Sequence, residues 1–175
     1  MNKLKILIIL LAAFTISCSS EFKDKQIEIV ISQVKKLDTT DFSFIKGENK
    51  NNKYFRVKVD IINHSDTAFG YVSMNCTWQE NWISNKNNFL LLPETHCIHN
   101  SPDLYVIEPK KKKTLYSVLI VDESIGDFNN QNSKLGMVLV RLNEIPANVN
   151  FKDVLRSKLE QKKDIIWSNP IYLKE

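Results

Sequence analysis

The chain has 175 residues, 43% of them hydrophobic and 10% aromatic, which is enough for one domain with an apolar core. Its 24 lysines and arginines stand against 20 aspartates and glutamates, a formal net charge of +4. This composition indicates a globular protein. So small an excess of positive charge gives no case for a nucleic-acid partner, since nucleic-acid binders concentrate basic residues on one surface.

The first 17 residues have the layout of a secretory signal peptide. Lys3 and Lys5 are followed by an uncharged apolar run over residues 6–16. A helix of these 11 residues spans roughly 16 Å, whereas bilayer hydrocarbon is about 30 Å thick. The run is therefore too short for a permanent membrane span and suits a signal peptide that directs export.

The run ends in Thr15-Ile16-Ser17-Cys18, which resembles the lipobox of bacterial lipoprotein precursors. In that family a small residue precedes a cysteine that receives fatty acids such as palmitate and becomes the new N-terminus. The resemblance implies removal of residues 1–17 and lipidation of Cys18, and two or more acyl chains make such attachment stable. Thr15 departs from the usual leucine. The alternative is an ordinary signal peptidase that leaves Cys18 as a spare thiol.

We expect residues 18–25 to be a tether between the lipid and a single domain formed by residues 26–175. An aspartate directly after the lipidated cysteine would resemble an inner-membrane retention signal, but this chain has Ser19 at that position. The resemblance therefore implies a lipid-anchored protein of the cell envelope, attached to the outer membrane and facing the periplasm or the cell surface.

Alternation of apolar and polar residues dominates the expected domain. Between residues 54 and 62, and again around Ile27, Ile29 and Ile31, successive side chains would point to opposite faces of a sheet. Further strands are predicted where β-branched and aromatic residues gather, over residues 69–78, 89–92, 104–107, 115–121, 136–142 and 165–173. Polar connections separate these segments, and such spacing predicts an antiparallel β-sandwich.

One segment breaks this pattern. Phe151, Val154, Leu155 and Leu159 share one helical face, and Asn150 is a suitable N-cap. We predict a short helix over residues 151–162 that packs over an open end of the sheets, with a surface helix for a membrane or a partner as the alternative. Pro170 cannot donate a hydrogen bond in a sheet, so the last strand is expected at an edge there.

Cys76 and Cys97 are an even pair once Cys18 is assigned to lipid, and disulfides persist outside the cytosol. We predict that they form a disulfide, which would stabilise the fold by roughly 3 kcal/mol. The stretches 71–78 and 96–102 also resemble small lipoproteins of Bacteroidota that pair a Cys-x-Trp strand with a later Cys followed by Asn-x-Pro. This resemblance implies an immunoglobulin-like β-sandwich without a known activity.

Histidines and cysteine cluster once, as His96, Cys97 and His99. They could supply two or three metal ligands, but structural zinc needs four and catalytic zinc three with water, and a disulfide would occupy Cys97. We therefore expect polar loop residues, with no metal and no cofactor. His64-Ser65-Asp66 contains the residue types of a catalytic triad, but three consecutive residues rarely align as one, so we interpret them as turn formers.

The four glycines are too scattered for a phosphate loop or a dinucleotide fingerprint, and the sequence predicts no enzyme. Asp66-Thr67-Ala68 resembles the site at which Bacteroidota attach O-linked glycans, which makes Thr67 a candidate for modification. The run from Lys110 to Lys113 could touch anionic headgroups, although a solvated turn is the commoner use.

Trp78, Trp82 and Phe89 flank a polar stretch and form a possible binding edge for a sugar or a protein, with core packing of Trp78 as the alternative. Taken together, the sequence predicts a membrane-anchored, non-catalytic binding or interaction module with a protein or glycan partner. A structural, accessory or immunity-type lipoprotein with a dedicated protein partner is the alternative, followed by an enzyme or a metal-binding protein.

Overall fold

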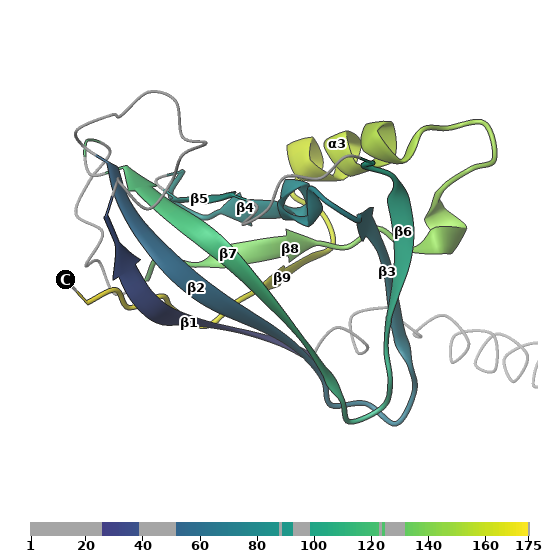
Figure 1. Cartoon of the computed structure of the whole chain (residues 1–175). Coiled ribbons are helices and arrows are strands. Elements are labelled where there is room, and N and C mark those ends of the chain that lie inside the picture. The colour runs from purple at the N-terminus through teal and green to yellow at the C-terminus, as the bar shows by residue number, and fades with distance from the viewer. Residues whose placement is uncertain are drawn as a thin grey trace, which may run out of the picture.

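Figure 1 shows the computed structural model of the protein, which describes residues 26–38, 52–87, 89–92, 99–122, 124 and 132–174. Within these residues the chain consists mainly of strands in antiparallel sheets, with one α-helix. The predicted class, mainly β with a short helix near the C-terminus, is confirmed.

The first layer is a four-stranded sheet in the order β1-β2-β7-β5. Its strands are β1 (Ile27–Leu37), β2 (Asn52–Asn63), β7 (Lys112–Asp122) and β5 (Phe89–Leu92). In β2 the alternate side chains of Phe55, Val57, Val59 and Ile61 are fully buried, as the sequence pattern predicts. One face of this sheet therefore belongs to the core.

The second layer combines two smaller sheets, which are β3 (Phe69–Met74) with β6 (Pro102–Ile107), and β4 (Trp82–Ser84) with β8 (Leu135–Val138) and β9 (Ile165–Trp167). They are joined where the Val72 N–H donates to the Val140 carbonyl at 2.7 Å. The buried Asn81 amide also donates to the carbonyls of Val72 and Val138, each at 3.2 Å. The Asn81 side chain thus supplies hydrogen bonds to two backbone carbonyls in place of a neighbouring strand.

The two layers pack face to face, as in a sandwich. Leu135, Met137 and Ile166 of the second layer share one buried cluster with Val57 and Leu119 of the first. β4 was missed at the sequence level because it is three residues long and follows a short 3-10 helix at Trp78–Asn81. The strand predicted over residues 69–78 is too long, because β3 ends at Met74.

The helix α3 (Phe151–Gln161) begins as predicted, with the Asn150 side chain accepting a hydrogen bond from the Lys152 N–H at 2.9 Å. Its predicted position is wrong. α3 does not close an open end but lies along the outer face of the second layer (Figure 1), where Phe151 and Leu155 join a second buried cluster. The reason is that the outward side chains of β3 and β8 are themselves apolar, namely Val72, Met74 and Val138.

Two other predicted strands are also too long. β8 ends at Val138, and Leu142 lies in a 3-10 helix (Leu142–Glu144). β9 ends at Trp167, so Pro170 lies in no strand. Instead Asn169 donates its backbone N–H to the Ile29 carbonyl, and its side-chain amide bonds both the N–H and the carbonyl of Ile31, at 2.7 and 3.2 Å. The C-terminal segment therefore covers the edge of β1 through a side chain.

A candidate binding cleft at the corner of the two layers

Two connections cross between the layers side by side at one corner of the molecule. The chain passes from β2 to β3 over residues 64–68 and from β6 to β7 over residues 108–111 (Figure 1). The Asn63 N–H donates to the Lys111 carbonyl at 2.9 Å, and the His64 N–H donates to the Gln26 carbonyl at 2.7 Å. The start of β1 is thereby held at the same corner.

Asn63 organises this corner, although it is fully buried and polar. Its amide nitrogen contacts the carbonyls of Thr67, Ile107 and Glu108 at 2.8, 3.0 and 3.3 Å. Its amide oxygen accepts from the Ser65 N–H at 2.9 Å and lies 2.6 Å from the Ser65 hydroxyl. Both crossovers are therefore fixed by one side chain.

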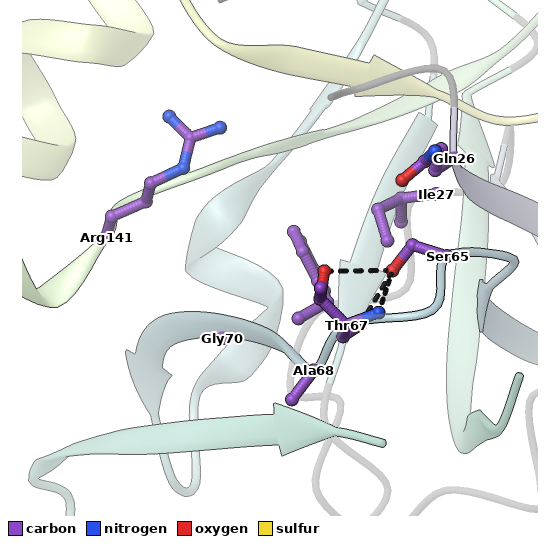
Figure 2. A pocket seen from close by; sticks show the side chains of 8 residues that line it. Gln26, Ile27, Ser65, Thr67, Ala68, Gly70 and Arg141 are labelled. Carbon is purple, nitrogen blue, oxygen red and sulfur yellow. Dashed lines mark hydrogen bonds between the residues drawn. The ribbon is translucent and has the colours of Figure 1, made fainter. Parts of the chain in front are cut away.

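A cleft of about 230 Å³ opens between these elements (Figure 2). Three separate parts of the chain line it, namely the start of β1, the crossover into β3, and the segment after β8. The described lining residues are Gln26, Ile27, Ser65, Thr67, Ala68, Phe69, Gly70 and Arg141. Half of them are apolar or glycine and half are polar, so the lining mixes both kinds of residue.

The polar residues of the lining lie on opposite sides of the cleft. Ser65 is buried, and its hydroxyl lies 2.6 Å from the Thr67 carbonyl oxygen and accepts from the Thr67 N–H at 3.3 Å. The Thr67 hydroxyl, 3.4 Å from that of Ser65, belongs to an exposed residue. Figure 2 shows Gln26, Ser65 and Thr67 together on one side and Arg141 across the cleft from them.

Arg141 belongs to a network of ion pairs with Glu144, Lys158 and Asp164. Its backbone N–H donates to Glu144 Oε2 at 2.7 Å, and its Nη1 lies 3.6 Å from Glu144 Oε1. Lys158 Nζ lies 2.7 Å from both Glu144 and Asp164. Burial opposes charge on Glu144, but the hydrogen bonds from Lys158 and from the Arg141 N–H hold its pKa below the usual value. Glu144 therefore stays ionised and orients Arg141.

Several residues singled out in the sequence lie outside the described part of the chain, namely Cys18, His96 and Cys97. Lipidation of Cys18 and the pairing of Cys76 with Cys97 stay predictions. The segment that follows Cys97 does lie against Cys76. The Cys76 sulfur is 2.8 Å from the His99 carbonyl oxygen, and Asn100 Oδ1 accepts from the N–H groups of Cys76 and Thr77 at 3.3 Å each.

The possible binding edge divides between surface and core. The rings of Trp78 and Trp82 meet edge to face, with centroids 6.0 Å apart, and both are partly buried against the main core. Phe89 is 6% exposed and belongs to that core from the other layer, so it presents no surface. A binding edge formed by the two tryptophans stays a prediction.

The predicted turn at His64-Ser65-Asp66 is confirmed as a turn. His64 Nε2 pairs with Glu28 Oε2 at 2.7 Å, away from the Ser65 hydroxyl, and Asp66 pairs with Lys110 at 3.0 Å. Thr67 is exposed in this turn, and its glycosylation stays a prediction.

The run from Lys110 to Lys113 is divided among different partners. Lys110 Nζ bonds the His64 carbonyl at 2.6 Å, and Lys112 pairs with the buried Asp60 at 3.2 Å. Lys113 Nζ lies 3.8 Å from the Tyr105 ring centroid, and burial lowers its pKa although the charge of Asp103 acts in the opposite direction. Three of the four lysines therefore have contacts of their own within the described residues.

No group of three or more His, Cys, Asp or Glu side chains that could hold a metal is found among the described residues. In the same residues, no helix combines the length and the apolar character needed to cross a bilayer. No model of a known protein family matches the chain, and no curated protein matches it.

The cleft residues Gln26 and Arg141, and the role of Asn63 in fixing the corner, were missed at the sequence level. Gln26 directly precedes β1 and Arg141 is the N-cap of the 3-10 helix after β8, and a single polar residue at such a place carries no periodic signal. Asn63 is the last residue of β2 and suggests a turn after it, which is correct, but its contacts with residues 44 and 45 positions away could not be inferred from the sequence.

Proposed function

We propose that the protein is a lipid-anchored, non-catalytic binding module of the bacterial cell envelope, and that the corner cleft is its ligand site. The observation that carries this proposal is the make-up of the cleft, where apolar residues and polar side chains from three parts of the chain converge. Ligand sites have this composition, with a few oriented polar groups set in apolar surroundings. The bonds of Asn63 keep one wall in place before any ligand arrives.

The proposed anchor would keep this cleft near the membrane. Eight residues lead from Cys18 to Gln26, and a fully extended chain of that length covers at most roughly 29 Å. Gln26 lines the cleft. A partner or ligand in the envelope would thus be met within that distance of the lipid, and a Cys76–Cys97 disulfide would suit the same oxidising compartment.

The anchor is tested by metabolic labelling with palmitate. We expect label on the wild-type protein and on the control Cys76→Ala, and none on Cys18→Ala. Equal labelling of wild type and Cys18→Ala would remove the anchor from the proposal.

The cleft is tested by affinity purification of the tagged, membrane-attached protein. Ala68→Trp places a bulky ring at an exposed residue that lines the cleft, whereas Ala147→Trp makes the same change at an exposed residue elsewhere. We expect a specific component to be recovered with wild type and Ala147→Trp and lost with Ala68→Trp. Equal recovery with both variants would exclude the cleft as the site.

A further inference from the structure

We infer that β6 is an interaction surface for a second copy of the chain, and that the two β6 strands pair antiparallel about a two-fold axis at Tyr105. The β3–β6 sheet of one copy would then continue into that of the other. The inference goes beyond the proposed function, because it depends on neither the cleft nor the lipid anchor. Its test is therefore independent of theirs.

β6 forms an edge of the second layer. It pairs with β3 on one side, and among the described residues no strand pairs with its other side. Figure 1 shows β3 between β6 and the strands β8 and β9. An edge strand presents backbone N–H and C=O groups that can pair with another chain, and a bulge is one way to prevent this. The register of β6 with β3 runs over six residue pairs without a shift.

The hydrogen bonds of Val72 on β3 show which groups of β6 face outward. The Val72 N–H donates to the Val140 carbonyl and the Val72 carbonyl accepts from the Asn81 amide, so neither points at β6. Leu104 is the residue of β6 opposite Val72. Opposite residues of an antiparallel pair exchange both bonds or neither, and the two kinds of pair alternate. Leu104 and Val106 therefore direct their N–H and C=O groups to the open edge.

The side chains at these two positions are apolar and exposed. Leu104 is 45% exposed and Val106 is 50% exposed. They share one face of the strand, because they are two residues apart. Gly70, opposite Val106 on β3, has no side chain that could cover them. Exposed apolar side chains thus lie beside backbone groups that face an open edge, which is a combination that a pairing strand would bury.

The spacing of the two residues makes this edge complementary to itself. In an antiparallel pair centred on Tyr105, Leu104 of one copy faces Val106 of the other, and the two-fold axis repeats the contact. Both members of each facing pair direct their backbone groups outward, so each pair exchanges N–H···O=C bonds in both directions. Their apolar side chains also meet across the strands. A second copy therefore satisfies the backbone and the side chains of the edge together.

Asp103 competes with this pairing. Its Oδ1 accepts a hydrogen bond from the outward Leu104 N–H at 2.8 Å, so this donor has a partner in the single copy. When two copies pair, the N–H passes to the Val106 carbonyl of the other copy, and the exposed Asp103 carboxylate returns to water. A strand pair is also small beside the typical interface of about 800 Å² per partner. We therefore expect a dimer that dissociates on dilution.

The test is sedimentation equilibrium of the purified full chain in density-matched detergent over a range of concentrations. We expect the mass of the wild type to rise from monomer to dimer with concentration. Val106→Lys should raise the dissociation constant at least about tenfold, because a lysine on an edge strand opposes pairing, and Leu104→Glu should do the same. The double variant Leu104→Glu/Val106→Lys should associate again, because each introduced glutamate faces an introduced lysine of the other copy.

Two further variants sharpen the test. Leu90→Lys is the matched control, because Leu90 is a 58% exposed apolar residue on another strand at a sheet edge, β5. It should leave the dissociation constant unchanged, which also excludes association through the detergent micelle or through β5. Asp103→Ala removes the competing acceptor and should lower the dissociation constant severalfold.

Hydrogen exchange gives a second measurement on the wild type. The Val106 amide should be protected at concentrations where the dimer forms and should exchange quickly on dilution. The Tyr105 amide, which faces β3, should stay protected at both concentrations.

The inference is overturned if the wild type keeps the monomer mass at a chain concentration of about 0.5 mM. It is also overturned if Val106→Lys associates as the wild type does, or if the Val106 amide exchanges quickly at both concentrations. Loss of association in Leu90→Lys would assign the contact to β5 and contradict it as well. A double variant that remains monomeric would exclude the register centred on Tyr105.

Discussion

The centre of the sandwich and the corner that carries the cleft are stabilised by different forces. In the centre, the apolar side chains of β2 and its neighbours are buried against those of the other layer, and the hydrophobic effect holds the layers together. At the corner, a buried asparagine, a buried serine and several backbone groups bond one another. The stability of the centre depends on how much apolar surface is buried, whereas the stability of the corner depends on which polar atoms form hydrogen bonds.

This difference has a functional side. An apolar centre tolerates exchange of one hydrophobic residue for another of similar size. A polar corner with fixed bonds tolerates little change, but it holds oriented donors and acceptors next to open space. The same bonds that satisfy the buried groups of the corner therefore preorganise the cleft.

The largest effect is expected at the centre. Phe55→Ala removes a fully buried ring from β2 and should lower the free energy of unfolding by about 3–5 kcal/mol. Urea denaturation measures this loss, and Phe55→Leu, which keeps much of the volume, should cost clearly less. A loss below about 1 kcal/mol for Phe55→Ala would mean that the layers do not pack through β2.

A smaller but still large effect is expected at the corner. Asn63→Ala leaves the carbonyls of Thr67, Ile107 and Glu108 without this donor and should cost about 2–3 kcal/mol in the same experiment. The control is His64→Ala, which removes only an exposed pair with Glu28 and should cost less than about 1 kcal/mol.

Asn63→Ala should also weaken capture of the partner by the cleft, because one wall loses its fixed geometry. Equal stability of the two variants would show that the corner is not held by Asn63.

The two regions also differ in how far the sequence predicts them. The strand predicted over residues 54–62 is β2 (Asn52–Asn63), and the helix predicted over 151–162 is α3 (Phe151–Gln161). Both are local patterns with a fixed period, so neighbouring residues are enough to reveal them. The sandwich follows from the number of such strands.

What the sequence could not predict depends on contacts between distant residues. The segment 165–173 has the composition of a strand, but the chain leaves the sheet after Trp167. The Asn169 side chain instead forms a hydrogen bond with Ile31, 138 positions away. α3 has an apolar face of the expected kind, yet its place depends on Val72 and Met74 of another strand. The cleft combines Gln26, Thr67 and Arg141, which share no motif.

Asn169→Ala should have a moderate effect. It removes two side-chain hydrogen bonds to Ile31 and should cost about 1–2 kcal/mol, because the edge of β1 then loses its cover there. Hydrogen exchange should speed up at the Ile31 amide, while the amide of Val57 in the centre of the sheet stays protected. If exchange at Ile31 is unchanged, the C-terminal segment is not what protects this edge.

The smallest effect concerns pH, at Asp60 between the centre and the corner. Burial opposes its charge, but hydrogen bonds from Thr114 at 2.5 Å and from Lys58 and Lys112 hold its pKa below the usual value. Because the folded pKa is lower than the unfolded one, ionised Asp60 contributes stability that is fully present above the unfolded pKa near 4 and is lost as the pH falls through the lowered folded value.

Asp60→Asn should therefore reduce the loss of unfolding free energy between about pH 6 and pH 2.5, as followed by urea denaturation at each pH. Thr114→Val removes one donor to the carboxylate and should give a slope between those of wild type and Asp60→Asn. Lys58 and Lys112 both pair with Asp60 Oδ2, and only the ionised carboxylate carries the negative charge that attracts them. A wild-type slope in Asp60→Asn would therefore mean that these two contacts do not stabilise the carboxylate in solution.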